Sequence, residues 1–167
     1  MSLNWVMRTD FGINSTPFVL LPNEVILYTL PQRAQVELSP VGQEKPETLS
    51  IRRAQVFLTS QRIVILNRTD TQTETSKDLD LSFIDNFTLL YQDIRSYKLD
   101  MPWFGSNKFK FLFNISNPDG GLNYLYPWSM TVHFIEGGAI EFSKSFSQVL
   151  TRFNNDQIDE LPQYTPN

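Results

Sequence analysis

The sequence contains no cysteine. A disulfide framework, a zinc site built on thiolates and a cysteine nucleophile are therefore all excluded. Histidine is nearly missing as well, because His133 is the only one. A catalytic triad or a transition-metal site would have to depend on that single imidazole. The sequence accordingly predicts a protein that is not an enzyme and that uses neither a metal nor another cofactor.

Long apolar runs are also missing. Residues 1–8 form no run long enough for a signal peptide, and no stretch approaches the length of a transmembrane helix. Acidic residues outnumber basic ones, which gives a net charge of −4 and a pI of about 4.9. This balance speaks against sequence-independent nucleic-acid binding and against bulk attraction to an anionic membrane. Together these absences predict a cytoplasmic protein, small enough to be nuclear as well.

Aromatic residues, in contrast, are abundant. They make up 13% of the 167 residues and include 13 phenylalanines, against 19% charged residues, which is typical of a folded domain with a sizeable core. In residues 53–68, two runs rich in branched and aromatic side chains flank Thr59-Ser60-Gln61, which predicts a hairpin. Residues 63–66 are apolar on both faces, so we expect a central strand that a helix or second sheet covers.

Alternation and turn residues predict the other strands. The expected strands are 24–30, 35–38 (as an edge or a bulge), 87–90, 93–99, 108–116, 124–135 and 139–142, with loops at 39–48 and 69–77. A change of period then predicts a helix, because Phe146, Val149, Leu150 and Phe153 share one helical face. Ser145 and Gln148 form a candidate capping box for this helix. Asn154-Asn155 is its expected end.

This order of elements is the plan of a pleckstrin-homology-like domain. We expect a mainly β fold, a partly open barrel of about seven antiparallel strands with one C-terminal amphipathic helix. Three regions follow: 1–20 as a segment of uncertain order, 21–155 as the domain, and 156–167 as a tail. The apolar residues expected to hold the first segment against the domain are Trp5, Phe11, Phe18, Val19 and Leu20.

Three segments resemble the GRAM-domain family, and within it proteins of the WW domain-binding protein 2 type. They are residues 54–65 (AQVFLTSQRIVI), 103–107 (WFGSN) and 137–142 (GGAIEF). The resemblance covers residues 24–153, and its last two motifs are the more specific. It implies a GRAM domain of pleckstrin-homology-like fold in an adaptor or transcription coactivator that binds WW domains. Unlike many such proteins, this chain has no long tail of Pro-Pro-x-Tyr motifs, and residues 69–77 are an additional polar loop.

A short motif near the C-terminus could bind a WW domain. Leu161, Pro162 and Tyr164 match the Leu-Pro-x-Tyr variant of the WW-binding motif, with Leu161 replacing a first proline. Proline favours an extended polyproline conformation that packs on an aromatic groove, and the tyrosine ring fills a second pocket. The alternative is an ordinary tail whose Leu161 and Tyr164 fold back on the domain. The partners implied are WW-domain proteins such as a ubiquitin ligase or a transcription regulator.

Basic residues offer a second possible function, binding a phosphoinositide and recruiting the protein to a membrane. A phosphoinositide head group needs two or three such side chains that converge at the mouth of a barrel. The candidates are Arg53, Arg62, Arg68, Lys108 and Lys110. The alternative, which we prefer, is that these side chains are solvated or paired with carboxylates.

Two further features have competing interpretations. Trp103 and Phe104 lie between two expected strands, and would contact a partner or membrane if exposed. We prefer the interpretation that both rings fill the core, with Gly105 at a positive φ. His133 lies inside an expected strand, where a hydrogen-bonded structural histidine is preferred over a catalytic one. The main prediction is thus a non-enzymatic adaptor, and the alternative is a lipid-binding module.

Overall fold

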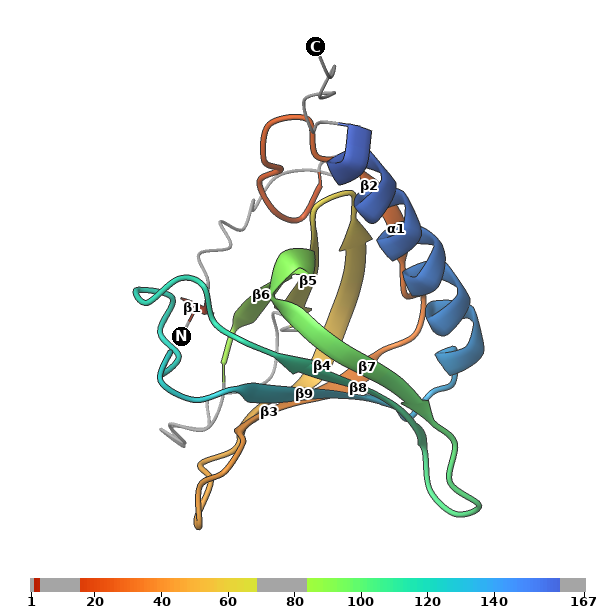
Figure 1. Ribbon diagram of the computed structural model, residues 1–167. Helices are drawn as coiled ribbons and strands as arrows, with labels where there is room; N and C mark the ends of the chain where they lie inside the picture. Colours follow the sequence, from red (N-terminus) through yellow and green to blue (C-terminus); the bar gives the residue numbers. More distant parts are fainter. Residues whose placement is uncertain (1, 4–15, 69–83, 160–167) are drawn as a thin grey trace.

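One bent sheet and a C-terminal helix make up the part of the molecule that the computed structural model describes, residues 2–3, 16–68 and 84–159 (Figure 1). The strands are β1 (Ser2–Leu3), β2 (Ile26–Thr29), β3 (Ala34–Pro40), β4 (Leu49–Thr59), β5 (Arg62–Asn67), β6 (Asn86–Leu90), β7 (Ile94–Asp100), β8 (Asn107–Phe113) and β9 (Trp128–Phe134). A short 3-10 turn, η1 (Tyr91–Asp93), follows β6, and the helix is α1 (Ala139–Asp159). The expected mainly β fold with one C-terminal helix is confirmed.

The strands form a single sheet in the order β1-β6-β5-β4-β3-β9-β8-β7, with β2 paired to β4 beside this path. All pairs are antiparallel except β1 with β6. In Figure 1 the sheet bends so that β7, β8 and β9 cross the lower ends of β4 to β6, and α1 lies along the right-hand side. Because β1 and β7 end the path without pairing to each other, the barrel is open, as in pleckstrin-homology-like folds.

The predicted hairpin is confirmed as β4 and β5, and its second strand is buried on both faces. Ile63 and Ile65 belong to the main core, whereas Val64 and Leu66 belong to a second, smaller core on the opposite face. Among the described residues, neither a helix nor a second sheet covers that face. The N-terminal segment does so instead, because Phe18 is 0% exposed and its ring lies 5.2 Å from that of Phe57, edge to face.

The part of the main core that lies between β8 and α1 is an aromatic cluster. Phe109, Phe111 and Phe113 of β8 all face inward, as their alternation predicts. Phe142 and Phe146 of α1 are 0% exposed and lie 5.4 and 5.1 Å, ring to ring, from Phe109 and Phe111. The helix therefore closes the barrel through two rings that are four residues apart, one turn of helix.

Residues 139–142 are not the strand that the sequence predicts, because they form the first turn of α1. The chain turns at Gly137 and Gly138, both with φ of +92°, and the Phe142 amide donates to the Gly138 carbonyl at 3.0 Å. Phe142 thus extends the apolar face of the helix by one turn. The positive φ is what favours glycine at position 138, because the 2.6 Å approach of an added Cβ to Gln32 Oε1 can be relieved by moving that flexible side chain.

Other boundaries differ as well. The strand predicted at 124–135 begins only at Trp128, since Pro127 has no amide hydrogen to pair. Segment 35–38 is not an edge, because β3 lies between β4 and β9, although its register with β4 does shift between Ala34 and Val36. The helix starts before the predicted capping box at Ser145 and Gln148 and continues past Asn154 to Asp159.

Candidate functional site

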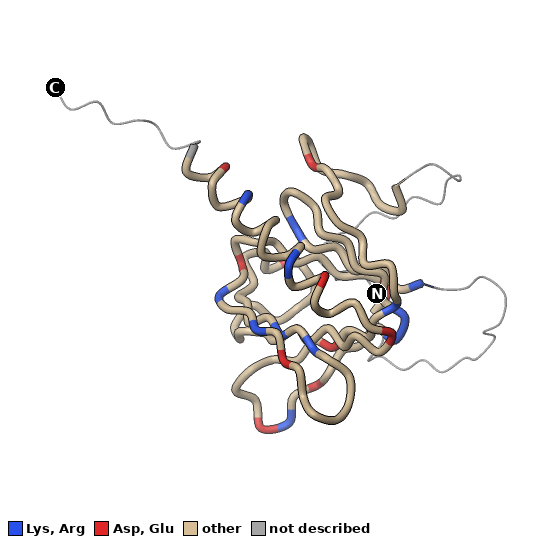
Figure 2. Tube along the Cα trace, turned by 90° about the vertical axis from the view of Figure 1, so that its right-hand side faces the viewer, with Lys and Arg blue, Asp and Glu red and all other residues tan. Residues whose placement is uncertain are grey.

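The predicted WW-binding residues Leu161, Pro162 and Tyr164 lie outside the described residues. The helix that precedes them is described, and its C-terminal end is exposed. Phe153 contacts Tyr91 at 5.4 Å, ring to ring, but residues 154–158 are all exposed, including Ile158 at 65%. Figure 2 shows the last turns of α1 projecting from the body of the molecule. The motif therefore follows, in sequence, an exposed and projecting helix end.

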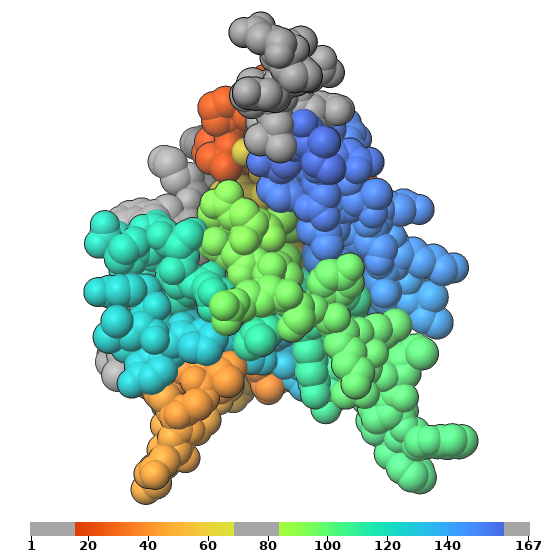
Figure 3. All heavy atoms as spheres, in the orientation of Figure 1, coloured from red at the N-terminus to blue at the C-terminus, as the bar shows by residue number. Residues whose placement is uncertain are grey.

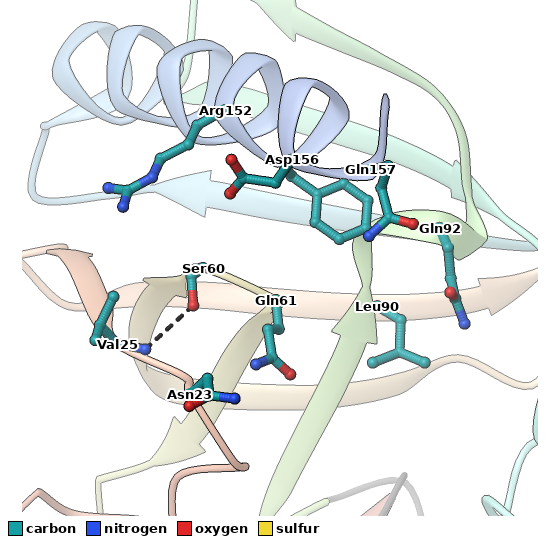
Figure 4. Close-up of a pocket in the computed structure, with 10 residues that line it drawn as sticks. Asn23, Val25, Ser60, Gln61, Leu90, Gln92, Arg152, Asp156 and Gln157 are labelled. Atoms are coloured by element: carbon teal, nitrogen blue, oxygen red, sulfur yellow. Dashed lines mark hydrogen bonds between the residues drawn. The ribbon is translucent and has the colours of Figure 1, made fainter. Parts of the chain in front are cut away.

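A groove of about 720 Å³ lies beside this end of the helix. In Figure 4, Arg152, Asp156 and Gln157 reach from α1 toward Ser60 and Gln61 at the β4–β5 turn. The other lining residues are Asn23, Val25, Leu90, Gln92 and Phe153. Sequence reasoning missed this groove, because its walls come from segments far apart in the chain.

The groove is lined by polar and apolar surface in similar amounts, and most of its uncharged polar groups are side-chain amides. Two of its polar residues already hold its walls together, since the Val25 amide donates to Ser60 Oγ at 3.1 Å and Gln61 Nε2 donates to the Pro22 carbonyl at 2.9 Å. Amide side chains of this kind can hydrogen-bond a peptide backbone. Its charged side chains, Arg152 and Asp156, are of opposite sign, so the groove has no strong preference for an anion or a cation.

Arg62 does not project from the hairpin turn into solvent. Its side chain is 4% exposed and forms an ion pair with Glu24, whose side chain is 0% exposed. Arg62 Nε donates to Glu24 Oε1 at 2.8 Å, and Nη2 donates to Glu24 Oε2 at 3.0 Å. Nη2 also donates to the Val19 carbonyl at 3.0 Å, and the guanidinium lies 5.8 Å from the centre of the Phe18 ring. The guanidinium is thus enclosed, which leaves it unable to bind a phosphate.

Glu24 is the centre of a buried polar network. Besides Arg62, it accepts hydrogen bonds from the Thr59 hydroxyl at 2.7 Å and from the Leu21 amide at 2.6 Å. Burial alone would raise the pKa of Glu24, but these hydrogen bonds and the Arg62 charge outweigh it and hold the pKa below its ordinary value of 4.5. Tyr91 donates to the Thr59 carbonyl at 2.6 Å, and burial, with the nearby Glu24 charge, raises the pKa of its hydroxyl. The network therefore ties the N-terminal segment to the β4–β5 turn.

The other predicted phosphate-binding residues do not converge at one place. Arg53 in β4 and Arg68 after β5 are neighbours, since the Arg68 amide donates to the Arg53 carbonyl at 2.8 Å. Lys108 and Lys110 lie in β8, which β3 and β9 separate from β4. Three strand spacings amount to roughly 14 Å. Lys110 also pairs with Asp100, its Nζ 3.5 Å from Oδ2, as the preferred interpretation predicts.

Trp103 and Phe104 do not fill the core. They are 100% and 93% exposed at the tip of the β7–β8 loop, residues 101–106, and Met101 beside them is 58% exposed. Figure 3 shows this loop at the lower right, standing clear of the body. Gly105 has the expected positive φ, +92°, and open space around it. The glycine was thus placed correctly, whereas the rings beside it point outward.

His133 has the role of a structural histidine in β9. Its Nε2 lies 3.1 Å from Glu37 Oε2 on the neighbouring strand β3, and its side chain is 18% exposed.

Within residues 16–68 and 84–159, no three carboxylate or imidazole groups gather in a way that could hold a metal ion. No helix in the described part is both long and apolar enough to cross a bilayer. Comparisons with protein-family models and with curated proteins find no match for this chain.

Proposed function

We propose that this protein is a non-enzymatic adaptor, a GRAM-like scaffold whose C-terminal motif at Leu161, Pro162 and Tyr164 binds WW-domain proteins. The observation that carries the proposal is the exposed end of α1. Residues 154–158 are all exposed, and the motif begins two residues after Asp159, the last helical residue. A partner domain can therefore approach the helix end that directly precedes the motif in sequence.

The chemistry of the motif explains its expected affinity. Proline restricts the chain to extended conformations, so less entropy is lost when the motif binds an aromatic groove. The single proline here is preceded by leucine, which packs less well in that groove than a second proline. We therefore infer weak, reversible binding to a ubiquitin ligase or a transcription regulator in the cytoplasm or nucleus. The resemblance to GRAM-domain proteins supports this partner class.

A phosphoinositide site built on Arg62 is not part of the proposal. That arginine is bound to Glu24, and the remaining candidates lie on separate strands. A phosphoinositide head group needs several basic side chains that converge on one point, and these side chains do not converge in that way.

The test measures binding of the full chain to a set of purified WW domains. We expect wild type to bind at least one of them, and Tyr164→Ala to lose about tenfold or more in affinity, because the tyrosine pocket is left empty. Tyr124→Ala is the matched control, since Tyr124 is 56% exposed in the loop before β9. It should bind as wild type does. Equal binding by wild type and Tyr164→Ala would refute the proposal.

A further inference from the structure

The tip of the β7–β8 hairpin is the most exposed apolar feature among the described residues. It carries Trp103, Phe104 and Met101 beyond the paired strands, at 100, 93 and 58% exposure. A fully exposed tryptophan next to a nearly fully exposed phenylalanine is uncommon on a soluble surface and marks a contact site. The feature is independent of the C-terminal motif, which in sequence follows the opposite end of α1.

The hairpin holds this tip rigidly. Its strands are paired up to the loop, with Asp100 opposite Lys108 as the last pair. Tyr97 of β7 stacks on Phe109, with ring centroids 6.1 Å apart, and meets Phe146 of α1 edge to face at 5.0 Å. The tip is therefore anchored to the main core, and contact with a partner would cost little ordering of the backbone.

The hairpin also differs in charge from the rest of the chain. Asp100 is its single acidic residue, whereas the chain as a whole has a net charge of −4. Its basic residues are Arg95, Lys98, Lys108 and Lys110. Lys98 and Lys110 are exposed and directly opposite each other on β7 and β8. The hairpin is thus a local cationic arm on an acidic protein, which is attracted to an anionic surface.

Two more exposed apolar side chains follow β9, one next to the base of the hairpin and one in the first turn of α1. Ile135 is 62% exposed and directly follows Phe134, which pairs with Asn107 at the base of the loop. Ile140 is 54% exposed in the first turn of α1, a few residues further along. Glu136 between them is paired with Arg33, Nε to Oε1 at 3.3 Å, which reduces the negative charge at this end.

We propose that the β7–β8 tip is a membrane-interface site, in which Trp103 and Phe104 enter the head-group region of an anionic bilayer. Aromatic side chains prefer this boundary, where interfacial groups insert by roughly 5–10 Å. Lys108 lies at the start of β8, directly behind the loop that carries Phe104, and opposite Asp100 at the end of β7. The basic groups of the hairpin would then face the anionic head groups when the tip is inserted, where each basic group adds to binding.

The shape of the tip favours a bilayer over a protein partner. A specific protein interface buries about 800 Å² on each side and needs a broad surface or a groove. The tip is instead a narrow convex loop that stands clear of the body in Figure 3. Such a shape can enter a deformable lipid surface, and the cationic strands behind it match anionic head groups.

The test uses co-sedimentation of the full chain with vesicles of phosphatidylcholine containing about 30% phosphatidylserine, at low salt where surface attraction is strongest. The Trp103→Ser/Phe104→Ser double variant should lose roughly tenfold or more in partitioning. Tyr124→Ser/Leu125→Ser is the matched control, because both residues are exposed, at 56 and 71%, in a different loop. It should partition as wild type does.

A second readout separates insertion from simple adhesion. In a Trp5→Phe background, vesicles with brominated acyl chains should quench the emission of Trp103. Adding Trp103→Phe should keep most of the binding but lose that quenching, since the remaining tryptophan, Trp128, is only 6% exposed. No vesicle binding at low salt, or equal binding by the tip variant and wild type, would overturn the proposal. Capture of a protein by wild type and not by the tip variant, without vesicle binding, would assign the tip to a protein interface and overturn it as well.

Discussion

At the scale of single residues, the pair of Glu24 and Arg62 shows how context decides a role. Arg62 follows the β4–β5 turn, where the sequence alone allows a solvated cation. Its partner is 38 positions away in the chain and is brought to it by the N-terminal segment. No short-range sequence pattern predicts a pair so far apart in the chain. The sequence could therefore suggest that Arg62 is paired with a carboxylate, but it could not identify Glu24 as the partner.

Removing the Glu24 charge is expected to destabilise the protein. Glu24→Gln should lower the free energy of unfolding at pH 7 by about 3 kcal/mol, because it leaves the Arg62 guanidinium buried without a countercharge. Denaturant unfolding of wild type and variant measures the difference. Glu44→Gln, in the exposed loop between β3 and β4, is the control and should change stability by less than about 0.5 kcal/mol.

The same pair predicts a pH dependence with a definite sign. Because the folded-state pKa of Glu24 lies below 4.5, its contribution to stability is complete above pH 4.5 and is lost as the pH falls through the folded-state pKa. The difference in the free energy of unfolding between wild type and Glu24→Gln should therefore become smaller as the pH falls below 4.5. Burial raises the pKa of Asp93, so this carboxyl group changes stability with pH in the opposite direction to Glu24. Because Asp93 is present in both proteins, its effect cancels when their free energies of unfolding are subtracted. A difference that stayed constant down to pH 3 would contradict this assignment.

At the scale of elements, regular alternation was the most informative signal. It placed β8 and its inward phenylalanines, because each side chain's face follows from a period of two. It could not place Trp103 and Phe104, since loop residues have no period that fixes which way they point. The first turn of α1 was missed for a related reason. Four residues after a glycine turn fit a short strand as well as a helix, and only the contact of Phe142 with the core separates the two.

The attachment of α1 should depend on Phe146. Its ring contacts those of Phe109, Phe111 and Tyr97 at 5.4, 5.1 and 5.0 Å between centroids. Phe146→Ala should cost about 3–5 kcal/mol of stability, through lost burial and the cavity left behind. Lys144→Ala, on the exposed face of the same helix, should change it by less than about 0.5 kcal/mol. Thermal and denaturant unfolding check both values, and a small effect of Phe146→Ala would mean that α1 is held elsewhere.

At the scale of the whole molecule, the fold was predictable because strand order, turns and one amphipathic helix all agree with a single architecture. The candidate sites were predictable only in part. The second core illustrates the limit, because apolar residues on both faces of β5 correctly predicted a cover, but the expected helix or second sheet was wrong. Phe18 and Leu20 provide it from a segment without any clear period.

The two cores should unfold together because β5 contributes to both. Phe18→Ala should therefore shift the entire unfolding transition, by about 3 kcal/mol, instead of loosening only the N-terminal segment. In a Trp5→Phe/Trp103→Phe background, the fluorescence of Trp128 in the main core and far-UV circular dichroism should report coincident transitions. Val19→Ala is the control, since Val19 is 46% exposed. An unchanged Trp128 transition in Phe18→Ala would show instead that the segment detaches independently.

The length of α1 also has a geometric consequence. Its 21 residues extend for about 30 Å, with one end near the β7–β8 side of the barrel and the other at the opposite pole (Figure 1). A molecule docked on a surface by the β7–β8 tip would hold Asp159, the end of α1, at about this stand-off distance. The helix would therefore set how far from that surface the C-terminal motif begins.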